Sequence, residues 1–434
     1  MNYAYSVMKI LISIGSLGLG GAEKQAVWLA NEFSKANEVT LVTYHGGERE
    51  VDLSERVKWF RLFTKGEPET LLKSLYEKQD SRGYKHFSVQ RSLFINSVKL
   101  IPFYLKRKVI KFRLFLISND SKWKHTRKFF LNISHLRYFF MIFFKTYRII
   151  SKVKPEYVIT FLYHDTLLIG LAAALRFRKP KIIVGRRSPF GYCDANRNWL
   201  QNLAIRFVYL RSDSAVSNSS ANNSQAILDG IKPHKISIVS NFVEQGSVNF
   251  QKSTSDKLQL VCMANFFEYK NHVNLIKALA NFDNQIDITF LGDGPLKLDL
   301  LGKVNELNID ARFINHQDQV KANIYEIDFL ILPSLFEGNS NALLEALVAG
   351  FPAISTPVGA AFDLKAMGAP LIITNGFAPT DFQNAIEIAI RHKISYLQEA
   401  RNFQGILART HGREAIFTQW LTLLQQLSNN SNRK

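Results

Sequence analysis

Cysteine is nearly absent from this chain, whose 434 residues contain only two, Cys193 and Cys262. Two cysteines so far apart provide neither a disulfide framework nor the spacing of a metal site, and they fit a reducing compartment such as the cytosol. No D-x-D triplet occurs, and no His and Cys residues are grouped with metal-ligand spacing. We therefore expect a site that uses neither a bound metal nor a cofactor.

Long apolar runs are also missing. The N-terminal stretch MNYAYSVMKILISIG lacks a basic region at its start and leads directly into a glycine turn, so it is expected to be a first strand and not a signal peptide. In the most aromatic part of the chain, the longest uncharged apolar run is Tyr138 to Phe144. That run is far short of the roughly 20 residues needed to span a bilayer, so no membrane-spanning helix is expected there.

Acidic residues are scarce in one segment. The whole chain carries 55 Lys and Arg against 36 Asp and Glu, a net charge of +19. Between residues 99 and 152, fourteen Lys and Arg accompany a single acid, Asp120. A basic, aromatic helix pair lying on an anionic membrane surface is the interpretation we favour. The alternatives are a solvated lid and a nucleic-acid site, the latter disfavoured because no nucleic-acid motif accompanies the charge.

The length and the hydrophobic content of 47% predict two globular domains. Strand and helix patterns alternate, which is typical of α/β domains with parallel sheets that bind ligands at the carboxyl ends of their strands. The polar segment EQGSVNFQKSTSDK reads as a linker. We expect an N-terminal domain at 1–243 with the basic insertion at about 64–154, the linker at 244–257, a second domain at 258–408, and a C-terminal helix in 409–434.

A glycine-rich turn follows the first predicted strand. Gly18 and Gly20 fit the first two positions of the dinucleotide fingerprint G-x-G-x-x-G, but Glu23 occupies the third. The next strand ends in Tyr44-His45, where that fold would place a ribose-binding acid. Binding of NAD is therefore not expected.

The most informative stretch runs from Leu332 to Gly350. A buried strand leads into a polar loop and a helix that Asn339 or Ser340 is expected to cap. Glu337 stands before the cap, and Glu345 lies eight positions later on the same side. Free N–H groups at a helix start suit a phosphate, and ionised carboxylates suit sugar hydroxyls. Together they indicate a nucleotide-sugar site.

This stretch resembles the signature of the family 4 retaining glycosyltransferases, a group 1 family of the GT-B fold. The resemblance rests on Glu337, on Glu345-Ala346, and on Gly350 and Pro352, with the GGAE element at Gly20 similar to the family's first loop. It implies two Rossmann-like domains whose parallel sheets face each other across a cleft. The implied mechanism is front-face attack with retention of anomeric configuration, the departing phosphate accepting the acceptor's proton.

The resemblance also implies roles for individual residues. Lys270 and Glu337 are the expected catalytic groups, Lys270 on the donor diphosphate and Glu337 on the sugar hydroxyls. Arg186 and Arg187 stand where many members have a histidine and are candidates for acceptor or anion binding. Asn265 stands where the family commonly has arginine. The expected donor-binding residues are Gly20, Gly21, Asn265, Lys270, Gly292, Gly338, Asn339, Ser340, Asn341 and Glu345.

The sequence thus predicts a retaining, metal-independent glycosyltransferase that moves a sugar from a UDP- or GDP-linked donor. The expected acceptor is a lipid-linked glycan or a polysaccharide such as O-antigen, capsule or exopolysaccharide. The expected location is the cytoplasmic face of the inner membrane, with contact through about 99–152. Two alternatives remain: a nucleotide-sugar epimerase of GT-B architecture, and a non-catalytic basic protein that binds membranes or nucleic acid. A two-carboxylate hydrolase is disfavoured because Glu337 and Glu345 share one helix end.

Overall fold

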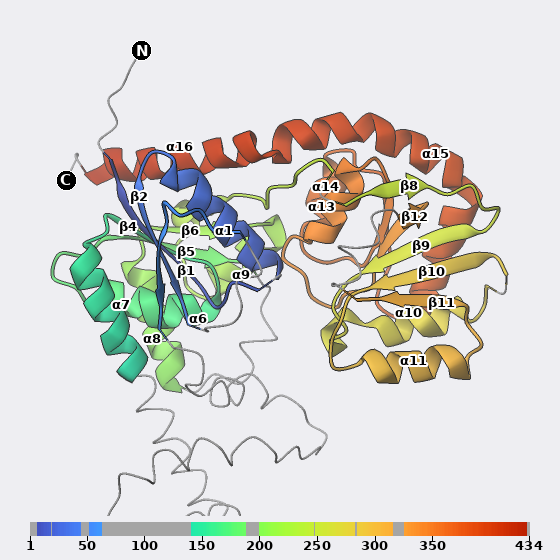
Figure 1. The fold of residues 1–434 in the computed structure, drawn as a ribbon, viewed down its shortest axis with the longest axis horizontal. Coiled ribbons are helices and arrows are strands. Elements are labelled where there is room, and N and C mark those ends of the chain that lie inside the picture. The colour runs from blue at the N-terminus through green and yellow to red at the C-terminus, as the bar shows by residue number, and fades with distance from the viewer. Residues whose placement is uncertain are drawn as a thin grey trace, which may run out of the picture.

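The computed structural model describes residues 7–18, 20–44, 52–62, 140–187, 199–246, 248–282, 284–315 and 325–431. Residues 63–139, which make up most of the predicted insertion and of the expected membrane segment, lie outside the described residues, as does Cys193. The described part forms two α/β domains side by side (Figure 1).

The N-terminal domain is built on a seven-stranded parallel sheet with the order β3-β2-β1-β4-β5-β6-β7. The central strand β1 pairs with β2 on one side and with β4 on the other. The strands are β1 (Lys9–Ile14), β2 (Glu38–Thr43), β3 (Lys58–Arg61), β4 (Tyr157–Thr160), β5 (Lys181–Arg186), β6 (Ser214–Ser217) and β7 (Ile236–Ile238).

The C-terminal domain contains a six-stranded parallel sheet with the order β11-β10-β9-β13-β14-β15, and a two-stranded ribbon of β12 and β8 beside it. Its strands are β8 (Phe250–Lys252), β9 (Leu258–Met263), β10 (Ile286–Leu291), β11 (Ala311–Ile314), β12 (Tyr325–Ile327), β13 (Phe329–Leu332), β14 (Ala353–Ser355) and β15 (Leu371–Ile373). Most of the expected strands are present, with ends that differ by one or two residues.

The central strands are apolar throughout because helices cover both faces of each sheet. In β4 and β13 every residue is buried, which is the pattern of parallel strands between two helical layers. In the N-terminal sheet the two layers have separate cores, one against α1 (Gly21–Ser34) and one against α8 (Trp199–Arg211). The C-terminal sheet likewise packs against one core on each face.

The remaining helices connect the strands on either side. They are α6 (Tyr163–Asp165), η3 (Thr166–Gly170), α7 (Leu171–Ala174), α9 (Ser220–Leu228), η4 (Pro233–Lys235), η5 (Glu268–Lys270), α10 (His272–Leu279), α11 (Lys297–Glu306), α13 (Asn341–Val348), α14 (Ala361–Ala366), α15 (Pro379–His411) and α16 (Arg413–Ser431). Residues 140–153 form a further helix on the outer side of the N-terminal domain. Among the described residues, no helix has both the length and the apolar character needed to cross a membrane.

The helical segment from Tyr163 to Ala174 is irregular. Its first turn is α6, because the Asp165 carboxylate accepts the N–H of Leu162 at 2.9 Å and so ends the preceding extended segment. A π-helical turn, η3, follows and leads into α7.

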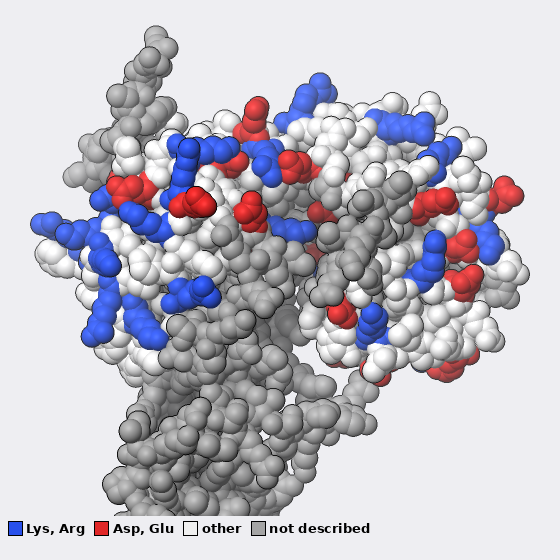
Figure 2. Space-filling model, viewed as in Figure 1, with Lys and Arg blue, Asp and Glu red and all other residues white. Residues whose placement is uncertain are grey.

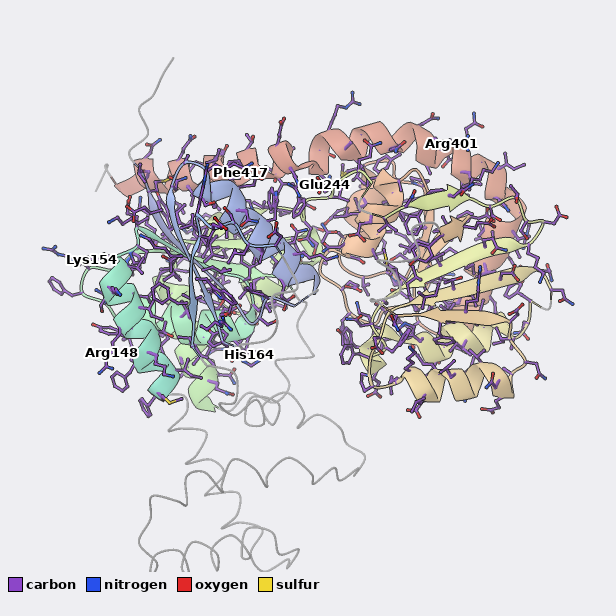
Figure 3. The ribbon with its side chains drawn as sticks, viewed as in Figure 1. Arg148, Lys154, His164, Glu244, Arg401 and Phe417 are labelled. Carbon is purple, nitrogen blue, oxygen red and sulfur yellow. The ribbon has the colours of Figure 1, made fainter. Side chains whose placement is uncertain are left out.

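The last helix returns to the first domain. The long helix α15 runs along the C-terminal domain to the connection between the domains, and α16 then runs along the N-terminal domain (Figure 1). Trp420 of α16 is buried in that domain's core, and the ring of Phe417 lies 5.2 Å from that of Phe33 (Figure 3). The Arg413 guanidinium pairs with Glu244, in the connection between the domains, at 2.8 Å. The two domains are therefore joined by an apolar anchor as well as by the linker.

Candidate active site

The loop before α13 holds the predicted acid in an ion pair. The Glu337 Oε1 atom lies 2.5 Å from the Lys270 Nζ atom, at the end of η5, and accepts a hydrogen bond from the Ser334 hydroxyl at 2.9 Å. The Leu335 N–H donates to the Tyr269 carbonyl at 2.8 Å, which ties the two loops together. The carboxyl ends of β9 and β13, which are neighbours in the sheet, thus bring together the two side chains expected to be catalytic.

The Lys270 side chain is charged although only 16% of it is exposed. Burial works against its charge, but the attraction of Glu337, with further contributions from Tyr269 and the hydrogen bond to Glu337, leaves the pKa of Lys270 raised above its ordinary value. A positive charge is therefore fixed at the sheet edge, with a carboxylate beside it.

A histidine lies beneath this pair. His272 is 1% exposed and packs between the rings of Phe266 and Phe290, with centroid distances of 5.3 and 5.9 Å. Burial, and then the charge of Lys270, lower the pKa of His272 to about 4, so the imidazole is neutral at pH 7. The sequence did not single out His272, because its lowered pKa depends on burial between two rings and on a lysine that only the fold places beside it.

Glu345 lies inside α13 and faces a different neighbourhood. Burial raises the pKa of Glu345, and the positive charge of Lys24 partly offsets that rise. Lys24 belongs to α1 of the N-terminal domain. The two predicted carboxylates therefore have different environments. Glu337 forms an ion pair within its own domain, and Glu345 interacts electrostatically with Lys24 of the other domain.

The predicted cap of α13 is wrong in its details. Ser340 occupies the N-cap position, but neither it nor Asn339 caps the helix through its side chain. The Asn339 amide instead donates to the Asn218 carbonyl at 3.2 Å and to the Ser240 hydroxyl at 2.5 Å, both in the N-terminal domain. Interdomain partners have replaced the local bond that the sequence suggested, which leaves the first N–H groups of α13 without a side-chain cap.

Asn341, the first residue of α13, also contacts the other domain. Its Nδ2 donates to the Gly21 carbonyl at 3.3 Å, and its Oδ1 accepts from Asn241 at 2.8 Å and from Gln25 at 3.4 Å. The Asn241 amide donates in addition to the Asn339 carbonyl at 2.9 Å. We call Gln25, Asn218, Asn241, Asn339 and Asn341 the amide cluster. It brings the starts of α1 and α13 together. Sequence reasoning missed Gln25, Asn218 and Asn241 because each has a partner in the other domain, far away along the chain.

Two of the predicted glycines have close backbone contacts. A Cβ atom on Gly338 would lie 2.1 Å from the Arg187 carbonyl, and one on Gly292 would lie 2.3 Å from the Ala264 carbonyl. These two positions therefore need a residue without a side chain. At Gly21 a Cβ atom would lie 3.0 Å from the Asn341 side-chain amide, a tight contact that a small shift of that side chain could relieve.

The other two donor-site predictions lie nearby. Gly20 is the N-cap residue of α1, and its carbonyl accepts the Lys24 N–H at 3.0 Å. Asn265 is exposed just after β9, where its backbone lies beside Gly292. Gly21, Gly338, Asn339 and Asn341 thus lie where the domains meet, whereas Asn265, Lys270 and Gly292 follow β9 and β10 within the C-terminal domain.

The two candidate arginines have opposite surroundings. Arg186 is buried and forms an ion pair of 2.5 Å with Asp229, each side chain 7% exposed. Its guanidinium is therefore paired inside the N-terminal domain, and its binding of an acceptor or anion stays a prediction. Arg187 lies over the Phe161 ring at 4.5 Å and donates to Asn241 at 2.7 Å. Burial lowers its pKa to about 10, so it is charged at neutral pH and stays a candidate for anion binding.

A buried carboxyl group completes the N-terminal side. Asp165 is 1% exposed, and burial, with a smaller contribution from the charge of Glu23, raises its pKa to about 8. The hydrogen bonds of Leu162 and Tyr44 lower that pKa only in part. Asp165 is therefore mostly protonated at pH 7. The sequence did not reveal this group, because a His-Asp pair after a strand is usually solvated.

The arrangement can bind an anion at the meeting point of the domains and hold hydroxyl groups beside it. Lys270 supplies a fixed charge, the start of α13 supplies N–H groups, and Glu337 and Glu345 supply acceptors. Within the described ranges, no group of three or more His, Cys, Asp or Glu side chains is placed to hold a metal ion.

Residues 247–404 match the family model described as glycosyl transferases group 1. This matched segment lies within the C-terminal domain and contains Lys270, Glu337 and Glu345. The similarity to the group 1 family therefore covers the part of the chain that carries the ion pair and α13.

Two relatives come from Campylobacter jejuni. N-acetylgalactosamine-N,N'-diacetylbacillosaminyl-diphospho-undecaprenol 4-alpha-N-acetylgalactosaminyltransferase is 27% identical over 198 residues, 43% of this chain and 54% of that protein. GalNAc-alpha-(1->4)-GalNAc-alpha-(1->3)-diNAcBac-PP-undecaprenol alpha-1,4-N-acetyl-D-galactosaminyltransferase is 25% identical over 345 residues, 79% of this chain and 77% of that protein. The chain thus spans about half the length of the first relative.

Among solved structures, the Anabaena protein HepE in complex with UDP aligns with a TM-score of 0.67 over 96% of this chain and 100% of its own, at 14% identity. This likeness covers both domains, and the GT-B fold predicted from the group 1 signature is confirmed.

Proposed function

We propose that the protein is a retaining, metal-independent glycosyltransferase of family 4 that transfers a sugar from a nucleotide-sugar donor. The observation that carries this proposal is the Lys270–Glu337 pair, 2.5 Å apart, in front of the uncapped start of α13 and at the meeting point of the domains. A single cation with N–H groups beside it suits a diphosphate, and a neighbouring carboxylate suits the attached sugar.

The donor we propose is linked to UDP or GDP. HepE was solved with UDP in the same fold, which supports a nucleotide at this place. In our scheme Lys270 and the N–H groups of α13 hold the diphosphate, Glu337 accepts from the sugar hydroxyls, and Glu345 accepts from the ribose. Burial raises the pKa of Glu345, and hydrogen bonds donated by ribose hydroxyls to its ionised form would lower that pKa again.

The proposed reaction breaks the bond between the anomeric carbon and the phosphate oxygen and forms a bond from the same face to the acceptor oxygen. The acceptor's proton passes to the departing phosphate, so no separate base is required. The charge that grows on the diphosphate is stabilised by groups already in place, Lys270 above all. His272, neutral at pH 7, adds no second charge to the site.

The acceptor we propose is a lipid-linked glycan or a related polysaccharide precursor. The names of both Campylobacter relatives specify undecaprenol-linked diphosphate substrates, which supports this class. An acceptor of that kind lies in a membrane, so we propose that the protein works at the cytoplasmic face of the inner membrane.

The test is a transfer assay with purified protein, UDP- and GDP-sugars and undecaprenyl-diphosphate-linked acceptors. Glu337→Gln and Lys270→Ala are each expected to lower kcat/KM about ten- to a hundredfold or more, because a charge-assisted hydrogen bond contributes about 1.5–3 kcal/mol. Lys303→Ala and Glu306→Gln, which alter an exposed pair in α11 of the same domain, serve as matched controls and should change little.

Two outcomes would contradict the proposal. One is full transfer by both site variants, which would remove the site. The other is turnover of a nucleotide sugar with no acceptor present, which would indicate an epimerase. A melting-temperature screen against UDP and GDP identifies the donor, because ligand at a hundredfold excess over Kd stabilises the folded state by about 2.7 kcal/mol.

A further inference from the structure

Large apolar side chains are exposed on three neighbouring helical segments of the N-terminal domain. They lie on the helix of residues 140–153, at the end of α7 and along α8. Their exposed fractions reach 58% at Phe144, 103% at Phe177 and 66% at Leu210. The set is Phe140, Phe144, Leu175, Phe177, Leu203, Phe207 and Leu210.

The same segments contain no acidic residue. Residues 140–153, 166–180 and 199–211 include eight Lys and Arg and not one Asp or Glu. Among the cations, Arg148, Lys152, Arg178 and Arg206 are exposed. Figure 2 shows Lys and Arg side chains gathered at the outer left edge of this domain, where Figure 3 labels Arg148. We call the seven apolar residues and these four cations the docking face.

The inner sides of the three segments are firmly packed, so their outward side chains are not the result of loose structure. Ile142, Ile150, Ile205 and Val208 share one buried core with the sheet. Gly170 lets α8 approach closely, since a Cβ there would lie 2.9 Å from a methyl group of Val208.

The end of α7 is also fixed to the outer helix. The Arg176 guanidinium lies over the Tyr147 ring at 5.1 Å and donates to the Ser151 hydroxyl at 2.5 Å. The three segments therefore form one rigid support. An exposed patch of large apolar residues on such a support is typical of an interaction surface.

We propose that the docking face binds an anionic lipid bilayer. Its cations match the charge of phosphate headgroups, and its Leu and Phe side chains are long enough to enter the acyl boundary. Nucleic acid would satisfy the cations, but it offers no apolar layer for Leu203 and Leu210, which carry no polar or aromatic group to contact bases or phosphates.

This proposal deepens the proposed function, because it specifies how an enzyme with a lipid-linked acceptor meets its substrate. The chain from α6 through η3 and α7 leads directly from the carboxyl end of β4, where Asp165 lies, to Leu175 and Phe177. The docking face includes the end of the segment expected at 99–152. It adds the end of α7 and the exposed side of α8, which were not predicted to contact a membrane.

The first test is flotation of the full chain with vesicles of phosphatidylcholine alone and with 30% phosphatidylglycerol added, about a third anionic lipid as on a charged leaflet. The full chain should float with the anionic vesicles. The triple variant Phe144→Ser/Leu203→Ser/Leu210→Ser should lose most of this binding. The control Leu298→Ser/Ile394→Ser removes two apolar residues of the C-terminal domain that are more exposed still, at 79% and 81%. This control should float like the full chain.

The second test reverses charge. Arg148→Glu/Arg206→Glu should lower partition at least about 25-fold, because each cation near an anionic leaflet contributes about a fivefold gain. The control Lys277→Glu/Arg401→Glu changes the net charge by the same amount, but on the C-terminal domain, where Figure 3 labels Arg401. This control should bind like the full chain.

The proposal is wrong if the unmodified chain fails to float, if both docking-face variants float like it, or if the control variants lose binding equally. It is also wrong if the variants change only sedimentation or nucleic-acid binding. Circular dichroism and the UDP-induced melting shift show that each variant is folded with an intact donor site. Loss of flotation with a normal nucleotide shift and normal transfer to a short, water-soluble acceptor separates failed docking from failure of the proposed chemistry.

Discussion

The contact between Gly338 and the Arg187 carbonyl makes a sharp prediction about domain closure. Gly338 lies in the loop that presents Glu337, and Arg187 belongs to the other domain. A Cβ atom at position 338 would lie 2.1 Å from the Arg187 carbonyl oxygen and 2.8 Å from the Asn218 Oδ1 atom. Replacing Gly338 with alanine therefore places one methyl group between the two domains at the reacting site.

The strain cannot be relieved by a small side-chain movement. The nearest atom is a backbone oxygen, and the loop cannot simply retreat, because a Cβ on Gly359 would already lie 2.3 Å from the Gly338 carbonyl. Ordinary contact requires a separation larger by roughly 1 Å, and a displacement of that size at a reacting centre costs about a hundredfold in rate. Overpacking of this kind costs about 1–3 kcal/mol when the surroundings cannot open. Here the domains can separate, so we expect the loss in catalysis and not in folding.

The assay compares donor binding with transfer. Lys270, Glu337 and α13 all belong to the C-terminal domain, so Gly338→Ala should bind the free nucleotide with nearly unchanged affinity. Transfer needs both domains, so kcat should fall about a hundredfold. Small-angle scattering of the variant with UDP should show a more open particle than the unmodified chain with UDP.

The matched control is Gly302→Ala, in α11 of the same domain, where a Cβ atom meets nothing within 4 Å. It should leave transfer unchanged and raise stability by about 0.4–1 kcal/mol, as expected for alanine in a helix. Normal transfer by Gly338→Ala would refute the reasoning, because it would show that these domains react without the contact seen here.

Four further substitutions concern titratable groups in the interior of the protein. The pKa of Asp165 is raised to about 8 from 3.8, so the folded state of the unmodified chain loses stability as the pH rises through that range. Asp165→Asn removes this loss and should gain roughly 3 kcal/mol relative to the unmodified chain between about pH 5 and 8. Denaturant titrations at both pH values measure the difference. The pKa of His272 is lowered to about 4 from 6.5, so the unmodified chain should lose roughly 2 kcal/mol of stability between pH 7 and 5. His272→Leu should remove this loss. An equal dependence of unfolding free energy on pH in both proteins would contradict the prediction. Arg186→Ala should cost about 3–5 kcal/mol because it removes the buried ion-pair partner of the Asp229 carboxylate, and denaturant titration measures this loss. Arg187→Ala should weaken acceptor turnover and change the melting temperature far less.

The sequence predicts the C-terminal half well because its site is built from local pattern. The strand, loop and helix around Glu337 follow from apolar runs and a turn, and the pairing of Lys270 with Glu337 follows from two loops at the ends of neighbouring parallel strands. The group 1 signature adds the residue identities. These features can be predicted without knowledge of the N-terminal domain.

The two arginines show where sequence reasoning stops. Arg186 and Arg187 are adjacent, and successive side chains at the end of a strand point to opposite sides. One therefore pairs with Asp229, which follows α9, and the other lies over the Phe161 ring. Which arginine takes which side depends on the register of β5 in the sheet and on an acid 43 positions along the chain, neither of which is visible in a local pattern.

The amide cluster extends this argument to function. Asn339 is a sound helix cap by composition, yet its amide bonds to the other domain, so the strongest local signal was displaced by partners that only closure supplies. These contacts are neutral hydrogen bonds, worth about 0.5–1.5 kcal/mol each net, and water can replace them when the domains part. The apolar packing of Trp420 on the far side cannot be replaced in this way. The contacts at one edge of the interface are therefore permanent, and those at the other edge can break and reform. We expect the domains to open about a pivot near Gly412, where α15 ends and α16 begins, and so to expose the start of α13 for nucleotide binding and release.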